Sequence, residues 1–509
     1  MFPEKKSDYI FCFLLCIPAV FFLFNPAKFP ADDGFFYPQI AYNFVHGKGS
    51  YFNDLYLTNG YHPLWMLFCV IAELINPFAK QDVVYILWIF QVIFIILTFK
   101  KLEFFFENNL SGKIIAYFTI SFLFFSLGTL YLTEAHLNLL CFSLMLAFLA
   151  SGKKNDWIFG FLFSLIFLSR LDNVFPLIFI SLYYFFQRKW DFRVFVKSGL
   201  IILLLCGSYL LSNWHWFGNF VPISGRIKSS FPNVQFHIPL KTVSIFFLII
   251  TLIYIVLAGF CKQLSNRILK LFFSAGAMTQ LLYNFAFQSQ IGQWYFVVQM
   301  LVLVLLIADL SNLLLKRTKP VLLYILLSLG LIITSFAGYL KMSSNFSLLA
   351  QNKIMDKKND EIKIFAEKLK AELPKHSRVF TYDFPGKLAF YSDLEIIPAD
   401  GLVANQEYFD AISNSDFSDF LRKNKIDYII LPSCFSNTNP YIVGMNIVFR
   451  DQKPVYFVTN SLYKTSNLLK MSNFYFKKSY PNPVKTWQKD YDSVSVFKIK
   501  SLSAKGKSE

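Results

Sequence analysis

Long apolar runs constrain the fold of this chain more than any other feature of its sequence. Through about the first 340 residues, segments rich in Phe, Leu and Ile recur at short intervals, and a helical run of about 20 such residues spans the ~30 Å hydrocarbon core of a bilayer. Hydrophobic residues make up 55% of the 509 residues and charged residues only 16%. Such a chain is too apolar for a soluble protein of this length, so we predict a polytopic membrane protein.

The apolar runs predict about eleven transmembrane helices. A further apolar stretch, Pro63 to Pro77, is short and bounded by polar residues, so we expect it to lie in or dip into the outer interface. The predicted spans are residues 9–28, 82–99, 114–131, 136–151, 156–169, 172–187, 195–213, 242–260, 269–287, 294–311 and 320–341.

The placement of Lys and Arg predicts the orientation, because these residues gather in cytoplasmic loops. Eleven spans with the N-terminus inside put Lys100 and Lys101, Lys153 and Lys154, and most other loop cations on the inner side. The first outer loop, about residues 29–81, and the C-terminal region then lie outside. The net charge of +17 is largely explained by these loops, so no nucleic-acid partner is expected.

From about residue 345 the sequence becomes polar and charged. We therefore divide the chain into a transmembrane domain, residues 1–344, and an extracytoplasmic domain, residues 345–509. The patterns predict a mixed α/β fold, with helices at 360–373 and 417–423 and strands at 378–384, 426–431 and 494–499. No nucleophile motif, phosphate loop or metal-ligand spacing occurs there, which favours a structural or acceptor-recognition role.

Two adjacent carboxylates, Asp32 and Asp33, begin the first outer loop. Adjacent carboxylates repel, and in a half-buried setting one of them can keep a raised pKa suited to a general base. The alternative is a solvated acidic loop.

Three cations on the same predicted side could hold a phosphate. Arg170 lies between two short spans, and Arg226 and Lys228 follow Pro222-Ile223-Ser224-Gly225, where small residues let backbone amides approach an anion. The alternatives are an Arg170–Asp172 pair that anchors helices and contacts to lipid headgroups.

Two further outer loops carry Glu134 with His136, and Trp294 with Tyr295. A divalent cation could be bound by Glu134, His136, His62 and the Asp pair, with Asp33, Glu134 and His136 as the candidate ligands. The spacing is not that of a defined metal site, so no cofactor is predicted with certainty. Taken alone, the two aromatic residues are typical of an interfacial belt.

The order of these motifs resembles the GT-C superfamily of integral-membrane glycosyltransferases, which includes the lipid A aminoarabinose transferases and the protein O-mannosyltransferases. Two departures concern Leu132-Thr133-Glu134-Ala135, where the family often has Gly-Met-Glu-Thr, and Gly34, where Ala is more usual. The matching segments are Asp32 to Tyr37, Thr58-Asn59-Gly60-Tyr61-His62-Pro63-Leu64-Trp65, Arg170 to Asp172, Pro222 to Gly225 with Lys228, Trp294 to Phe296, Gly386 to Ser392 and Asp400 to Leu402.

The resemblance implies an enzyme of the bacterial inner membrane that moves a sugar from a polyprenyl-phosphate donor to an extracytoplasmic lipid, glycan or protein, with inversion. By analogy Asp32 is the base and Asp33 its partner or a ligand. The resemblance assigns the leaving phosphate to Arg170, Arg226 and Lys228, and the sugar or acceptor pocket to Tyr61, His62, Glu134, Asp172, Trp294 and Tyr295.

Two other functions stay open at this point. A transporter or flippase of lipid-linked sugars would be expected to show polar residues at mid-membrane or internal repeats, whereas here the ionisable residues lie at span ends. An inactive relative acting in envelope glycan assembly would have less need of Asp32, Arg170 and Lys228.

Overall fold

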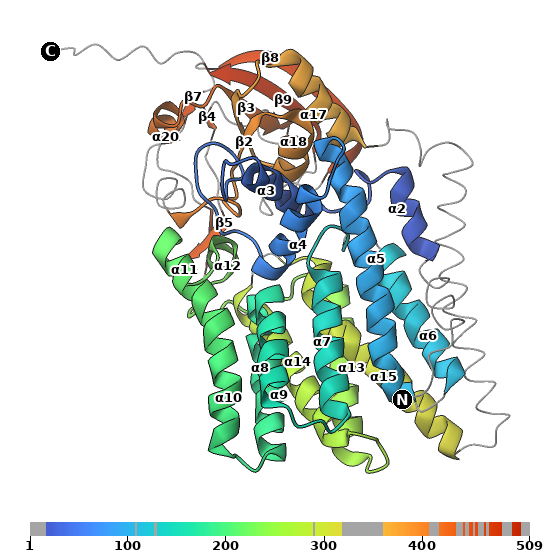
Figure 1. The fold of residues 1–509 in the computed structure, drawn as a ribbon. Coiled ribbons are helices and arrows are strands. Elements are labelled where there is room, and N and C mark those ends of the chain that lie inside the picture. Colours follow the sequence, from blue (N-terminus) through green and yellow to red (C-terminus); the bar gives the residue numbers. More distant parts are fainter. Residues whose placement is uncertain are drawn as a thin grey trace.

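The computed structural model of this chain describes residues 17–106, 109–126, 130–288, 291–317, 360–406, 417–433, 441–442, 447–450, 453–456, 463–464, 468–480 and 491–499. It is mostly helical. A bundle of helices forms the larger part, and a smaller part built around a β-sheet lies against one end of it (Figure 1). We call these parts the helical bundle and the sheet domain, and the covered end of the bundle the domain end.

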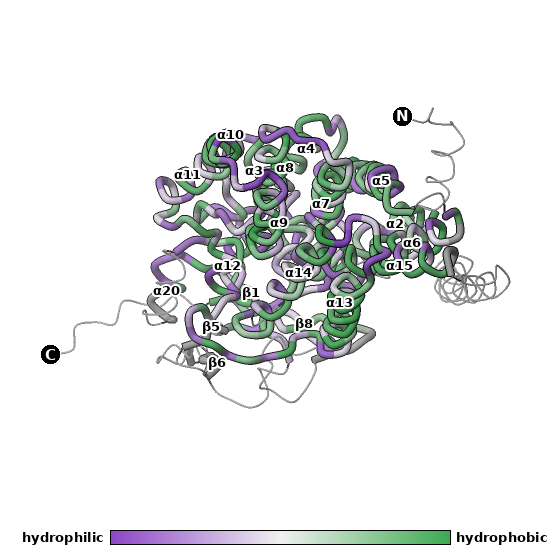
Figure 2. Tube along the Cα trace, turned by 90° about the horizontal axis from the view of Figure 1, so that it is seen from below, coloured by the Kyte–Doolittle hydropathy of each residue, from purple (hydrophilic) through white to green (hydrophobic). Residues whose placement is uncertain are grey.

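The helices of the bundle are apolar along most of their length (Figure 2). A π-helical turn, η7 (Leu203–Gly207), joins α10 to α11, and another, η5 (Phe122–Ser126), extends α6. The bundle contains α5 (Val83–Leu102), α6 (Leu110–Ser121), α7 (Ala135–Ala150), α8 (Asp156–Ser169), α9 (Val174–Gln187), α10 (Phe192–Ile202), α11 (Ser208–Phe217), α13 (Lys241–Phe260), α14 (Arg267–Phe287) and α15 (Val297–Arg317).

Over its described residues, each span predicted between residues 82 and 311 coincides with one of these helices or, for 195–213, with α10 and α11 joined by η7. Within the described residues, four helical stretches are long and apolar enough to cross a membrane: Lys80–Phe106, Phe192–Phe217, Lys241–Phe260 and Gln293–Leu314. Four shorter apolar helices accompany them: Pro63–Leu74, Gly112–Phe125, Ala135–Ala150 and Asp156–Ser169. The count of eleven spans therefore stays a prediction. The first predicted span is described only from residue 17, and the last, 320–341, lies outside the described residues.

A buried ion pair ties three bundle helices together. Lys270 of α14 donates to Asp309 of α15 at 2.6 Å, and the Tyr254 hydroxyl of α13 donates to the same carboxylate at 2.7 Å. All three side chains are almost fully buried. Because each charge has its counterpart and hydrogen bonds, the pair can be held in an apolar interior.

The segment between α2 (Phe21–Phe24) and α5 forms the layer between the bundle and the sheet domain (Figure 1). It begins with a 3₁₀ turn, η2 (Asp32–Phe35), which runs directly into α3 (Phe36–Val45). α4 (Pro63–Leu74) starts at a proline, whose fixed φ suits the first helical position. The indole of Trp65 donates to the Leu132 carbonyl at 3.0 Å and fixes α4 on the bundle.

The sheet domain contains a five-stranded mixed sheet in the order β2-β1-β3-β9-β8. β1 (Arg378–Thr381) pairs in parallel with β2 (Glu395–Pro398) and β3 (Tyr428–Pro432), and β9 (Tyr491–Ile499) runs antiparallel to β3 and to β8 (Leu468–Tyr480). The domain's helices are α17 (Glu361–Glu372), α18 (Pro385–Ser392) and α20 (Phe417–Lys423), and two small ladders pair β4 (Tyr441–Ile442) with β7 (Tyr463–Lys464) and β5 (Ile447–Arg450) with β6 (Lys453–Tyr456).

The mixed α/β prediction is thus confirmed for the C-terminal region, with its predicted helices at α17 and α20 and its predicted strands at β1, β3 and β9. α18, β2 and β8 were not expected. The predicted domain boundary at residues 344 and 345 lies outside the described residues.

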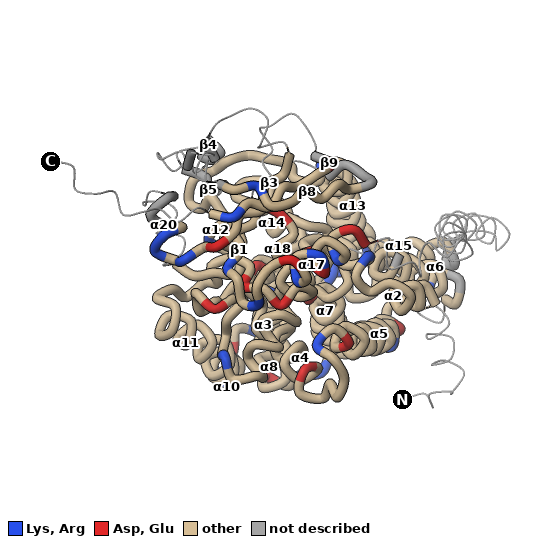
Figure 3. The backbone as a smooth tube through the Cα atoms, turned by 90° about the horizontal axis from the view of Figure 1, so that it is seen from above, with Lys and Arg blue, Asp and Glu red and all other residues tan. Residues whose placement is uncertain are grey.

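Polar contacts join the sheet domain to the first loop. Asn53 donates to the Ile396 carbonyl at 2.9 Å, and the Tyr56 hydroxyl donates to Asn424 at 2.9 Å. At the rim, Arg378 forms an ion pair with Asp54 at 2.6 Å. Seen from the sheet-domain side, acidic and basic residues gather over α3, α17 and α18 (Figure 3). Charge is therefore concentrated where the first loop and the sheet domain meet.

Candidate active site

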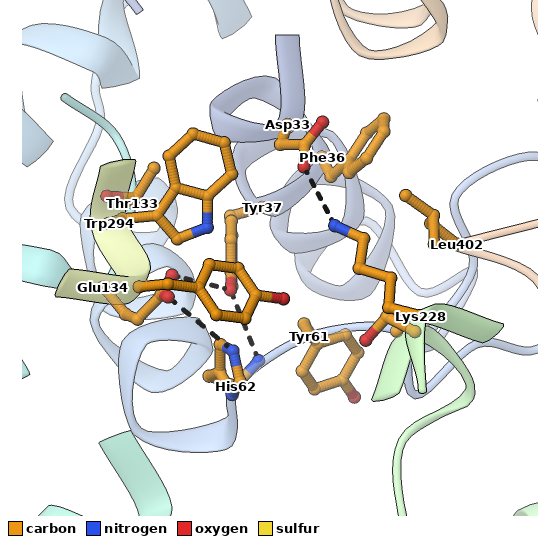
Figure 4. Close-up of a pocket in the computed structure, with 13 residues that line it drawn as sticks. Asp33, Phe36, Tyr37, Tyr61, His62, Thr133, Glu134, Lys228, Trp294 and Leu402 are labelled. Atoms are coloured by element: carbon orange, nitrogen blue, oxygen red, sulfur yellow. Dashed lines mark hydrogen bonds and ion pairs between the residues drawn. The ribbon is translucent and has the colours of Figure 1, made fainter. Parts of the chain in front are cut away.

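A pocket lies at the domain end, where the first loop, the bundle and the sheet domain meet (Figure 4). Its walls come from η2, α3 and the segment before α4, from the turn before α7, from α12 (Ile223–Lys228), from η8 (Gln293–Phe296) and from the sheet domain. The lining residues are Asp33, Phe36, Tyr37, Gly60, Tyr61, His62, Thr133, Glu134, Ser224, Lys228, Trp294, Tyr295 and Leu402.

Asp33 and Lys228 face each other across this pocket. The Lys228 ammonium lies 3.4 Å from the Asp33 carboxylate. Lys228 ends α12, where a cation is favoured by the helix dipole, and it is only 9% exposed. Burial disfavours its charge, but Tyr295, Asp33 and Asp400 together raise the pKa of Lys228 above its usual value. It is therefore a cation placed beside a carboxylate in a sheltered pocket.

Asp32 does not line the pocket. Its carboxylate points to the sheet domain and accepts the backbone N–H groups of Gly386 and Lys387, each at 2.8 Å, at the start of α18. Burial raises the pKa of Asp32 to about 7, although these two hydrogen bonds act in the opposite direction. The adjacent carboxylates diverge because consecutive residues of a 3₁₀ turn point about 120° apart.

Arg170 is already paired within the protein. Its guanidinium donates to Asp172 through Nε and Nη2, both at 2.9 Å, and to Glu134 through Nη1. The ring of Tyr295 covers it, with 4.0 Å between the guanidinium carbon and the ring centre. Arg170 is 2% exposed, so its main role in this arrangement is to compensate the two carboxylates and order the pocket floor.

His62 and Tyr37 complete the polar floor (Figure 4). The Tyr37 hydroxyl donates to Glu134 at 3.1 Å and accepts the His62 backbone N–H at 3.4 Å. Burial, followed by the charge of Arg170, lowers the pKa of His62 to about 3. His62 is therefore neutral at pH 7, and its 3.7 Å contact with Glu134 is not an ion pair. Within the described residues its buried Nδ1 has no hydrogen-bond partner, which leaves that atom available to a ligand hydroxyl.

Tyr61, Trp294 and Tyr295 line the pocket as predicted, whereas Arg226, Asp172 and His136 do not. Arg226 is exposed and donates to Asn219 at 2.6 Å and to Gln406 of the sheet domain at 2.8 Å. Of the possible metal ligands, Asp33 and Glu134 line the pocket, whereas His136 does not, and its fully buried ring lies 5.0 Å from that of Phe124 between ring centres. In the part of the chain that the structure describes, no three His, Cys, Asp or Glu side chains gather as they would around a metal ion.

Two larger and mainly apolar cavities adjoin the pocket. One, of about 430 Å³, shares His62, Ser224 and Tyr295 with it and continues past Arg170 and Asp172 toward Phe175. The other, of about 620 Å³, shares Tyr61 and runs between α4 and α11. The polar centre therefore lies between two spaces that suit apolar chains.

Several lining residues had no role assigned from the sequence. Tyr37, Thr133, Ser224 and Leu402 line the pocket, and Asp400 lies near Lys228 and Asp33, where burial raises the pKa of Asp400 to about 6. Each of these residues belongs to a segment that was compared with the GT-C motifs, and membership of such a segment was the sequence signal that could have pointed to it. Their contacts join segments far apart in the sequence.

Comparison with known proteins finds similarity in structure and not in sequence. No family model matches the chain, and no curated protein matches it. Its structure is similar to the crystal structure of ArnT from Cupriavidus metallidurans bound to undecaprenyl phosphate, with a TM-score of 0.59 and 12% identity over 88% of this chain and 97% of that one. Identity this low shows the fold alone: this chain has the fold of ArnT, which agrees with the fold expected from the resemblance.

Proposed function

We propose that this protein is a membrane glycosyltransferase that moves a sugar from a polyprenyl-phosphate donor to an acceptor hydroxyl, with inversion. The observation that carries the proposal is the Asp33–Lys228 pair in a sheltered pocket between two apolar cavities. A carboxylate can accept the acceptor proton, and a cation can stabilise a leaving phosphate. The solved structure of similar fold holds undecaprenyl phosphate, which supports a lipid phosphate as the partner.

The proposed reaction is a single displacement. The acceptor oxygen attacks the anomeric carbon, its proton passes to Asp33, and the bond between that carbon and the phosphate oxygen breaks. The electron pair stays on the lipid phosphate, whose extra negative charge develops beside Lys228. Since one displacement occurs, the anomeric configuration inverts.

The two carboxylates take different parts in this scheme. The family analogy favoured Asp32 as the base, but Asp33 is the carboxylate that lines the pocket. We therefore assign proton acceptance to Asp33. Donor binding also frees Asp33 for this role. A phosphate near Lys228 competes with Asp33 for the ammonium, and the Asp33 carboxylate then becomes available to the acceptor hydroxyl.

The floor of the pocket is assigned to the sugar. Tyr61 and neutral His62 offer hydrogen-bonding groups to sugar hydroxyls, and Glu134 is oriented by Tyr37 and Arg170. Trp294 and Tyr295 supply aromatic walls. Of the three cations predicted to hold phosphate, Lys228 is the one we retain as the principal group. Arg170 keeps a supporting role at the mouth of the cavity that it lines, with Asp172 beside it.

The two cavities suggest where the apolar parts of the substrates lie. We place the prenyl chain in the 430 Å³ cavity, which shares Ser224 with the pocket that Lys228 lines. The 620 Å³ cavity is then available to an apolar part of the acceptor. The acceptor hydroxyl belongs to a lipid, a glycan or a protein.

We propose the inner membrane of a bacterium as the location, with the N-terminus cytoplasmic and the sheet domain outside. The Lys and Arg bias of the loops supports this orientation. A membrane-impermeant thiol reagent applied to intact cells should label an Asp54→Cys variant, and labelling only after lysis would reverse the topology.

The rival function is transport of the lipid-linked sugar. The polar cluster at one end of the bundle favours chemistry there, whereas a transporter concentrates polar groups near mid-membrane. A lipid extract from the native cells, mixed with purified protein and envelope acceptors in detergent micelles, separates the two functions. There is no membrane to cross, so a transferase releases polyprenyl phosphate and a transporter leaves the lipid-linked sugar unchanged. An inactive relative would also leave it unchanged, and either result would refute the proposal.

A further inference from the structure

The contact between Asp32 and α18 joins η2, the turn that carries Asp33, to the sheet domain. Each oxygen of the Asp32 carboxylate accepts one backbone N–H, from Gly386 and from Lys387. A carboxylate at a helix N-terminus satisfies otherwise unpaired N–H groups and interacts favourably with the helix dipole. The two segments are also in close backbone contact, because a Cβ on Gly386 would lie 2.3 Å from the Asp32 carbonyl oxygen.

The same turn is packed against α18 on its other side. The Phe35 ring lies 5.4 Å from that of Phe390 and 5.5 Å from that of Tyr391, measured between ring centres. Asp33 lies between these two fixed points, Asp32 and Phe35, within the four-residue turn η2. The direction of the Asp33 carboxylate therefore depends on how η2 sits on α18.

A second close approach brings the sheet domain to the other wall of the pocket. A Cβ on Gly60 would lie 2.0 Å from the Leu402 carbonyl oxygen, and Leu402 itself lines the pocket beside Lys228 (Figure 4). Asp400 adds its charge near Lys228. The sheet domain thus touches the pocket on the side of the carboxylate and on the side of the ammonium.

We propose that Asp32 is a positioning residue: it anchors α18 of the sheet domain, and this anchor holds Asp33 in register with Lys228. The sheet domain is then a working part of the transfer site and not only an acceptor-recognition module. This inference rests on the proposed function for its kinetic consequence, while the anchor itself can be measured without it.

Four variants of the full-length protein test the anchor. Asp32→Asn removes one acceptor, and Gly386→Ala displaces the same contact without changing any charge. Asp33→Asn removes the proposed base and leaves the anchor. Asp54→Asn is the matched control, because it breaks an ion pair between the same loop and the same domain at the exposed rim.

Hydrogen exchange of peptides covering residues 384–392 reports the anchor, and transfer from the native lipid extract in micelles reports its effect. We expect faster exchange in Asp32→Asn and Gly386→Ala, with kcat lowered about tenfold or more and the donor KM changed less than about twofold. A merely structural role would lower the amount of folded protein without this split between kcat and the donor KM.

The controls make the outcomes separable. Asp33→Asn should abolish transfer with normal exchange at α18, and Asp54→Asn should change neither measurement. The proposal is overturned if Asp32→Asn abolishes transfer while α18 stays protected, since Asp32 would then act chemically. It is also overturned if the anchor variants expose α18 without affecting transfer, or if Asp54→Asn exposes α18 as much as Asp32→Asn. If the wild-type protein itself transfers nothing, the proposed function has failed, and the exchange data still test the anchor.

Discussion

Replacing Lys228 with methionine removes the positive charge from the pocket while keeping a long apolar side chain. The developing phosphate charge would lie about 4 Å from the ammonium, and at an effective dielectric constant of about 20 that interaction is worth about 4 kcal/mol. Measured hydrogen bonds to charged groups are weaker, about 1.5–3 kcal/mol. We therefore expect a loss of about 2–4 kcal/mol of transition-state stabilisation, which corresponds to about a 30- to 1000-fold fall in kcat/KM.

The assay is release of polyprenyl phosphate from the lipid-linked donor in micelles, followed by mass spectrometry over a range of donor concentrations. Lys48→Met is the matched control: Lys48 pairs with Glu395 at 3.4 Å at the exposed rim of the same interface, where an ion pair is worth about 0–1 kcal/mol. A Lys228→Met variant that keeps wild-type kcat/KM within about twofold would refute the assignment of the leaving phosphate to this residue.

Three further substitutions test the account at other points. Asp33→Asn should lower kcat at least about 100-fold, while undecaprenyl phosphate still stabilises the variant in a thermal-shift assay; near-normal kcat would remove Asp33 from the chemistry. Glu134→Gln leaves Arg170 partly uncompensated in a buried site and should destabilise the protein by about 3 kcal/mol or more, seen as a lower unfolding temperature in detergent, whereas unchanged stability would contradict the pairing. Lys270→Met should destabilise similarly by leaving Asp309 buried without its cation, and Lys270→Met combined with Asp309→Leu should recover most of that loss; a double variant no better than the single one would show that the pair is not the cause.

The sequence predicted the helical bundle well because each span carries its own signal. The run expected at 242–260 is the helix Lys241–Phe260, and its apolar length alone predicts it. The C-terminal strands were harder to predict from the sequence, since β2 and β8 depend on pairing with other strands. Strand pairing of this kind is a tertiary property with little local signal.

The sequence predicted most of the residues that form the site, but not what each of them does. Asp32 and Asp33 look equivalent in sequence, and the difference between them comes from α18, about 350 residues later. Arg170 was expected to hold phosphate because nothing local shows that Glu134, in the turn before α7, already pairs with it. Charge compensation depends on distances in space, which motif spacing does not give.

Arg226 illustrates the same limit. It shares a motif segment with Lys228, yet the two side chains leave the short helix α12 in different directions. Lys228 is buried in the pocket, whereas Arg226 reaches Asn219 and Gln406 at the surface. The contact with Gln406 also links α12 to the sheet domain, which no sequence pattern indicated.

The most direct test of the central claim is made in cells. Lipid-linked sugars and surface glycans are compared by mass spectrometry in cells that carry the wild-type chain, the Asp33→Asn variant, or no copy of the chain. We predict that cells with Asp33→Asn, like cells without the chain, accumulate the lipid-linked donor and make a glycan shorter by one sugar. A complete glycan and a normal donor level in cells that carry only Asp33→Asn would contradict the claim that this pocket transfers the sugar.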